Sequence, residues 1–144
     1  MSTNLKISES IAIDANAHKV WDVLTNPEKI KIYLGVPETI TDWKVGSPVV
    51  WRGELGGMKF EDKGRILENN HGNLLKFEYW SSFGGYDDVP ENYSVITYTL
   101  DTINDSKVKF TYTREGIPTE EEYQMFNTHL PFVLQGIKEL AEEE

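Results

Sequence analysis

Residues 119–140 read TEEEYQMFNTHLPFVLQGIKEL, and this stretch predicts one long helix near the C-terminus. Thr119 and Glu122, three positions apart, match the capping box that begins many helices. Pro131 lacks the N–H that a helix interior requires, so we expect a bend at residues 127–131. Apolar residues recur every three or four positions and define one stripe that another element has to cover: Tyr123, Phe126, Leu130, Val133, Ile137 and Leu140.

Upstream of this helix, six segments alternate apolar and polar residues in the manner of strands. They are residues 5–13, 48–54, 58–68, 73–81, 93–102 and 106–114. Gly, Asn and Asp are frequent in the breaks between the last five segments, so we expect antiparallel neighbours joined by turns. Two short helices should follow the first strand, because Asn16 can cap residues 17–25 and Pro27 can start a second helix that reaches about residue 32.

This order of elements predicts an α+β fold in one domain over residues 1–144. A strongly curved antiparallel sheet of about six strands would wrap around the C-terminal helix and cover its apolar stripe. Gly64, in the middle of its strand, is a plausible bend point for that curvature. No repeat, low-complexity tract or linker divides the chain.

Charge and composition narrow the classes of function. The formal net charge is −10, which disfavours binding to nucleic acid because phosphate backbones repel an acidic protein. The chain has no cysteine, and it shows neither a signal peptide nor a long apolar stretch, so we expect a cytoplasmic protein that does not enter a membrane.

Three charged residues interrupt the inward, apolar faces of the predicted strands. They are Glu9, Asp62 and Arg114. A charge in a dry core is costly, so each must be paired, reach solvent or line a wet cavity. A register slip of one residue, which reverses the facing of a strand, is an equally open explanation near strand ends and bulges.

Catalytic and metal motifs are not found. The three histidines, His18, His71 and His129, have no partner at a metal-ligand spacing, so we expect no metal and no cofactor. His18 is expected on the exposed side of its helix and His71 in a turn. His129 precedes the predicted bend and could face a cavity, although a structural or solvent-facing role is the simpler interpretation.

Several stretches resemble one known superfamily over nearly the whole chain. Residues 13–28 read IDANAHKVWDVLTNPE, and residues 64–68, 75–80 and 95–100 match later strands in order and spacing. The chain thereby resembles the START-like (SRPBCC) superfamily, specifically proteins similar to the activator of the ATPase of the ninety-kilodalton heat-shock chaperone. The resemblance implies a helix-grip fold with a cavity between sheet and long helix. Members bind hydrophobic ligands, act on them or serve as co-chaperones.

We therefore expect a small hydrophobic or amphipathic molecule to bind, without catalysis, between the sheet and residues 122–137. The candidate ligand-binding residues are Trp51, Phe60, Asp62, Phe77, Tyr79, Tyr98, Phe110, Tyr112, Arg114, Phe126, His129, Leu130 and Val133. The buried phenols at Tyr79, Tyr98 and Tyr112 would need polar partners from the ligand or from water.

Two alternatives stay open. A co-chaperone-like module would use its acidic surface to bind a chaperone protein and stimulate its ATPase. An enzyme would act on the enclosed molecule with Asp62, Tyr98, Arg114 or His129 as acid, base or anchor. Fold alone does not choose among these functions.

Overall fold

The computed structural model describes residues 5–82 and 85–143, and it is an α+β structure. The elements are β1 (Lys6–Ile13), α1 (Ala17–Thr25), α2 (Pro27–Leu34), β2 (Glu38–Ile40), β3 (Pro48–Leu55), β4 (Met58–Asn70), β5 (Leu74–Tyr79), the 3₁₀ helix η1 (Pro90–Asn92), β6 (Ser94–Asn104), β7 (Lys107–Glu115) and α3 (Glu120–Glu142). No helix within the described residues is long and apolar enough to cross a membrane.

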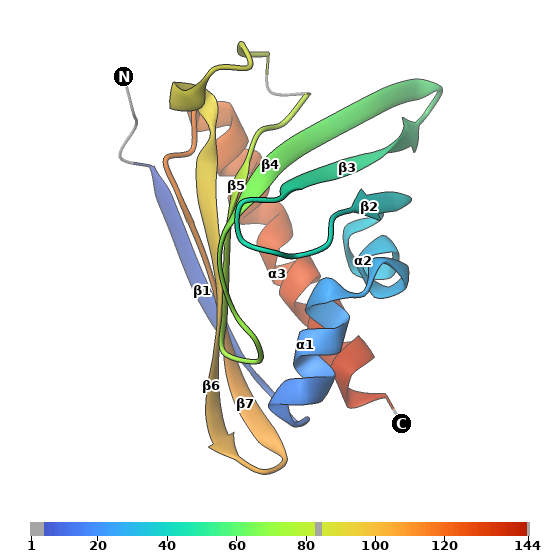
Figure 1. Cartoon of the computed structure of the whole chain (residues 1–144), viewed down its shortest axis with the longest axis vertical. Helices are drawn as coiled ribbons and strands as arrows, with labels where there is room; N and C mark the ends of the chain where they lie inside the picture. The colour runs from blue at the N-terminus through green and yellow to red at the C-terminus, as the bar shows by residue number, and fades with distance from the viewer. Residues whose placement is uncertain (1–4, 83–84, 144) are drawn as a thin grey trace.

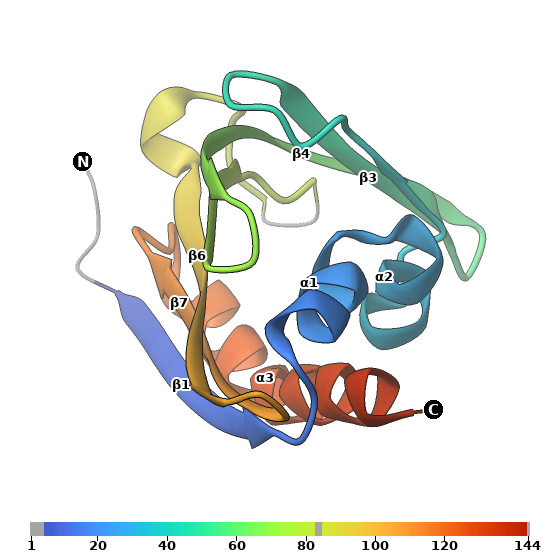
Figure 2. The same cartoon turned by 60° about the horizontal axis from the view of Figure 1, so that its bottom comes forward.

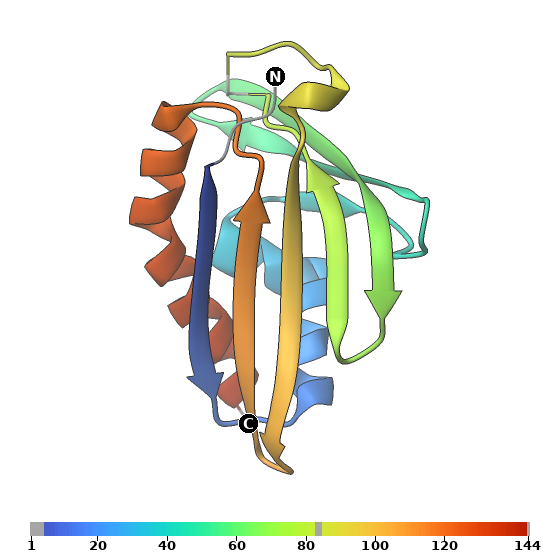
Figure 3. The same cartoon turned by 90° about the vertical axis from the view of Figure 1, so that its left-hand side faces the viewer.

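The strands form one antiparallel sheet in the order β1-β7-β6-β5-β4-β3-β2. The sheet curves around α3, and α1 and α2 lie at the open side of this curve (Figures 1 and 2). Figure 3 shows the outer face of the sheet with α3 behind it. The predicted helix-grip arrangement is confirmed, with seven strands instead of about six, because Glu38–Ile40 forms an edge strand too short to show alternation.

The helix boundaries follow from local capping. The Asn16 side chain accepts a hydrogen bond from the Lys19 backbone N–H, and Thr119 accepts one from the backbone N–H of Glu122. Pro27 opens α2, as expected. The predicted bend at residues 127–131 does not break α3, which continues through Pro131 with the proline ring exposed to solvent.

Most predicted inward positions are buried, but two are wrong. Glu9 is exposed because β1 is an edge strand, from which a charged side chain can reach water. Met58, whose place in the alternation of residues 58–68 predicts an inward side chain, is 62% exposed because it lies at the β3–β4 turn, beyond the core. The other two charged residues predicted on inward faces differ from Glu9, because Asp62 and Arg114 are both buried.

Gly64 lies where β4 and β5 approach most closely. A Cβ atom at this position would stand 1.6 Å from the Glu78 carbonyl oxygen, so only glycine fits without a backbone shift. The β4–β5 register also shifts between Ile66 and Glu68, and before Ile66 the next pairing is the single bridge Lys63–Trp80. The strand bends here as the sheet turns toward β3 (Figure 2).

We predict that Gly64→Ala destabilises the protein by about 3 kcal/mol or more, because the Glu78 backbone must move. Gly72→Ala is the matched control: it has φ +82 but no atom within 4 Å of its Cβ position, so it should cost only about 1 kcal/mol. Urea unfolding of both variants measures the difference. Equal losses would show that the close approach at Gly64 does not shape the sheet.

Candidate functional site

Aromatic rings form a continuous layer on the concave face of the sheet, opposite α3. Centroids of contacting rings lie 5.3–5.7 Å apart, and most pairs are tilted or edge-on, which is favourable for aromatic quadrupoles. The layer brings together six of the predicted ligand-binding residues from the sheet: Trp51, Phe77, Tyr79, Tyr98, Phe110 and Tyr112. A seventh, Phe126 of α3, stacks on Tyr112 from the helix side.

The layer is covered unevenly. Phe110 and Val108, near the β6–β7 turn, have no exposed surface. Tyr98 lies on the same concave face in the middle of β6, yet it keeps 7% of its surface, and Trp51 keeps 5%. Tyr98 and Trp51 therefore keep contact with accessible space, whereas Phe110 and Val108 do not.

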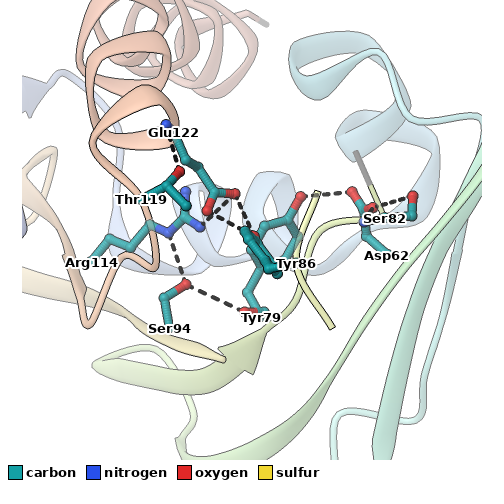
Figure 4. A network of polar contacts seen from close by, with 8 residues as sticks. All are labelled: Asp62, Tyr79, Ser82, Tyr86, Ser94, Arg114, Thr119 and Glu122. Carbon is teal, nitrogen blue, oxygen red and sulfur yellow. Dashed lines mark hydrogen bonds and ion pairs between the residues drawn. The ribbon is translucent and has the colours of Figure 1, made fainter. Parts of the chain in front are cut away.

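Arg114 of β7 is 1% exposed, and Figure 4 shows it directed toward Ser94 and Glu122. Its guanidinium carbon is 5.0 Å from the centre of the Tyr79 ring and 5.1 Å from that of Phe126. Its Nε donates a hydrogen bond of 2.8 Å to the Ser94 hydroxyl. Its Nη2 lies 3.1 Å from Oε1 of Glu122, so the two charges pair, although no N–H of this nitrogen is aligned on an acceptor.

Glu122 joins three parts of the chain at the start of α3. Its backbone N–H completes the Thr119 cap, and its buried carboxylate turns inward to Arg114. The Tyr86 hydroxyl, from the segment between β5 and β6, donates to the same carboxylate, with oxygen distances of 2.7 and 2.9 Å. Burial, followed by this bond to Glu122, raises the pKa of Tyr86. The segment after β5 is thereby tied to α3.

Asp62 has a second set of partners, all neutral (Figure 4). The Tyr79 hydroxyl donates to Oδ2 at 2.6 Å, while the backbone N–H and hydroxyl of Ser82 donate to Oδ1 at 2.8 and 2.9 Å. Burial, together with the neighbouring Asp62 charge, raises the pKa of Tyr79. The inward charge noted in the sequence is therefore satisfied by hydrogen bonds rather than by a cation.

Two other phenols differ from Tyr79. Tyr98 and Tyr112 are 7% and 2% exposed, and no hydrogen bond joins either hydroxyl to another described residue. Neither hydroxyl is sealed in the core, because the fully buried side-chain atoms without a partner in the described residues are Thr39 Oγ1 and Arg114 Nη2. Burial raises the pKa of both. Tyr33 of α2 lies near them: burial and then these two hydroxyls raise its pKa, and its own hydroxyl reaches the Leu24 carbonyl oxygen at 3.4 Å.

The remaining predicted site residues are dispersed. Leu130 is buried and Val133 half-buried on α3, among the core residues. His129 is exposed on α3, so it does not face the interior, because the buried stripe of the helix runs through Leu130 and Leu134 instead. His18 and His71 are exposed, as expected.

A depression of about 650 Å³ lies outside the aromatic layer, between β2 and the β3–β4 hairpin. It is lined by Pro37, Glu38, Arg52, Gly53, Glu54, Lys59, Phe60 and Glu61. Phe60, which is 7% exposed, is the one predicted ligand-binding residue among them. Arg52 lies 3.6 Å from Glu38 and 3.9 Å from Glu61, in exposed pairs that contribute little.

Sequence reasoning missed several members of the polar network. The sequence assigns Glu122 to the helix cap with Thr119, and it does not predict that the Glu122 carboxylate pairs with Arg114. An inward Arg114 requires an anionic partner, and this requirement could have pointed to Glu122. The first turn of α3, which contains Glu122, follows β7 directly in the chain. Tyr86, Ser82 and Tyr33 carry no such signal, because residues in loops and short helices show no periodicity that reveals their direction.

Comparisons with known proteins agree with this architecture. The model of the family described as Activator of Hsp90 ATPase homolog 1-like protein matches residues 14–142. A Cytophaga hutchinsonii protein of known solution structure is 37% identical with a TM-score of 0.81, over 99% of this chain and 97% of that one. No curated protein matches the chain.

Two more distant structures share the fold. A Chromobacterium violaceum protein is 18% identical, with a TM-score of 0.80 over 97% of this chain and 99% of that one. An HSP90 activator from Plasmodium falciparum is 14% identical, with a TM-score of 0.68 over 88% of this chain and 87% of that one. At these identities the likeness concerns the fold alone.

We predict strong coupling between Arg114 and Glu122. Arg114→Met or Glu122→Met alone leaves one charge buried without its counterion and should cost about 3–5 kcal/mol, whereas the double variant should cost at least 2 kcal/mol less than the sum, on the order seen for buried pairs. Urea unfolding of the four proteins measures the coupling. The exposed pair Lys6–Glu115 is the control and should show almost none. Additive losses at Arg114 and Glu122 would contradict a paired interior.

Proposed function

The chain belongs to the Activator of Hsp90 ATPase homolog 1-like family, and from this premise we propose that it binds a small apolar or amphipathic molecule between the aromatic layer and α3, without catalysis. The family and its START-like fold fit a ligand-binding or a chaperone-associated module. The interior of this chain favours the first of these.

The hydroxyls of Tyr98 and Tyr112 carry the proposal, because no hydrogen bond joins them to another described residue and neither is among the fully buried atoms without a partner. A hydroxyl that still borders accessible space can take its hydrogen bond from a molecule that occupies that space. The nearby Tyr79 and Tyr86 hydroxyls donate to Asp62 and Glu122. A bound molecule with one polar group would supply what Tyr98 and Tyr112 lack.

The surrounding rings would provide most of the affinity. Apolar surface removed from water contributes roughly 25 cal/mol per Å², so a molecule that buries about 200 Å² against the rings gains about 5 kcal/mol. The small exposed fractions of Tyr98 and Trp51, 7% and 5%, support this surface as the one that the molecule would contact. Few polar groups would then suffice to orient the molecule.

The enzymatic alternative gains no support from the groups proposed for it. Asp62 accepts three hydrogen bonds, and Arg114 is paired with Glu122. His129 is exposed on α3. Burial raises the pKa of Tyr98, so this phenol stays protonated at neutral pH and is a poor base.

We predict that the neutral fluorescent probe N-phenyl-1-naphthylamine binds the protein at one site. Phe126→Leu should weaken this binding about tenfold, because its ring stacks on Tyr112 at 5.4 Å and a loss of about 1.4 kcal/mol is a factor of ten. Ile103→Ala, which removes an exposed apolar side chain of β6, should leave the affinity unchanged. A probe titration followed by fluorescence measures all three proteins.

Absence of saturable binding at any soluble probe concentration would contradict the proposed function. Equal affinity of the Phe126→Leu variant and the unmodified protein would place the probe elsewhere.

A chaperone-associated role is the second candidate, and the outer face of α3 favours it. Met125 and Phe132, seven residues apart and therefore on one side of the helix, are 55% and 75% exposed. A large exposed aromatic side chain is typical of contact surfaces. A chaperone ATPase would be the partner, in the cytoplasmic location that the sequence predicts.

We predict for this candidate that the protein stimulates the ATPase of an HSP90-type chaperone, and that Phe132→Ser reduces the stimulation at least fivefold. Val45→Ser removes another exposed apolar side chain, far from α3 in sequence, and should have no effect. Steady-state ATP hydrolysis measures the outcome. Unchanged hydrolysis in the presence of the unmodified protein would remove this candidate.

A further inference from the structure

The buried charges of the described residues add up to an excess of one negative charge. They are Asp62, Glu122 and Arg114, two carboxylates and one guanidinium. All three lie in the network at the end of the aromatic layer where Tyr79 is found (Figure 4). In an environment that is poor in water, such an imbalance acts over several ångströms on any charged molecule that enters.

The single buried cation of the described residues is already paired with an anion, although its Nη2 has no aligned hydrogen-bond acceptor. Glu122 neutralises Arg114 at 3.1 Å, and the rings of Tyr79 and Phe126 lie within about 5 Å of the guanidinium. A second carboxylate at Arg114 would lie close to that of Glu122, and the two anions would repel each other in an environment poor in water. Asp62 would repel the second carboxylate as well.

The hydroxyls of Tyr98 and Tyr112 offer different chemistry. Their rings are 5.7 Å apart on adjacent strands, and both lie near Tyr33 of α2. Burial raises the pKa of both phenols, so at neutral pH each keeps its proton and can donate or accept a hydrogen bond. A neutral oxygen satisfies such a pair without bringing a charge into the interior.

We propose that the enclosed molecule is neutral, with an apolar body and one hydrogen-bonding oxygen, as in an alcohol, phenol or ketone, held at Tyr98 and Tyr112, and that Asp62 and Glu122 exclude anionic amphiphiles such as fatty acids. This inference rests on the proposed function and specifies the ligand class of the same site. Glu122 thereby acts as a determinant of specificity, because it occupies the one cation that an anion could use.

The test compares 1-octanol with octanoate, which have equal chain lengths, as competitors of bound N-phenyl-1-naphthylamine at pH 7.5. Octanol should displace the probe at a concentration at least tenfold lower than octanoate. Glu122→Gln should raise the affinity for octanoate at least tenfold relative to octanol, because Arg114 is then free of its counterion. The change in the octanoate-to-octanol affinity ratio between the variant and the unmodified protein does not depend on the different water solubilities of the two compounds.

Tyr98→Phe and Tyr112→Phe provide independent readouts that leave the charges in place. Either substitution should lower the affinity for octanol about fivefold and leave the affinity for octanoate unchanged. Octanoate binding as tightly as octanol, or a ratio unaffected by Glu122→Gln in a folded variant, would overturn the inference. Failure of the probe itself to bind would instead contradict the proposed function, so the two failures are distinguishable.

Discussion

The ion pair between Arg114 and Glu122 joins the two layers of this protein. Arg114 lies at the end of β7, beside the edge strand β1, and Glu122 lies in the first turn of α3. A buried guanidinium requires a counterion, and Ser94 and Tyr86 add hydrogen bonds to the two members of the pair. The pair thus constrains where α3 begins and which segment covers that end of the molecule.

Much of the fold could be predicted from the chain itself. Alternation in the strands, the Asn16 and Thr119 caps and the prolines located the elements, because each rests on local backbone chemistry. β2 was missed, since three residues cannot show a period. The predicted helix stripe packs against the core, but it is wider than predicted, because Leu134 and Ala141 are also buried.

The candidate site was predicted in part. The contacts between aromatic rings could be predicted, because alternating residues of neighbouring strands point to the same face of the sheet. The polar partners could not be predicted in this way. Tyr86 and Ser82 lie in the connection between β5 and β6, where side chains follow no regular alternation. His129 was placed near a bend that does not break the helix, and it is exposed. Charged residues at inward strand positions did indicate the site, because Asp62 and Arg114 are both buried and both belong to the polar network.

A common logic links the fold to the proposed ligand. The charges of the interior are satisfied among themselves or by neutral donors, which stabilises the sheet against α3 and leaves no charge for recognition. What remains is an aromatic surface with two phenol hydroxyls. Such a surface selects by shape and by a single hydrogen bond, which suits a family in which one fold serves several functions.

A crystal structure of the protein purified directly from cells, without added ligand, tests the central claim most directly. The account predicts electron density for a molecule that is not protein, in contact with the aromatic layer and within hydrogen-bond distance of the Tyr98 and Tyr112 hydroxyls. Rings in full contact with α3, with both hydroxyls bonded to protein groups and no space between the layers, would contradict it.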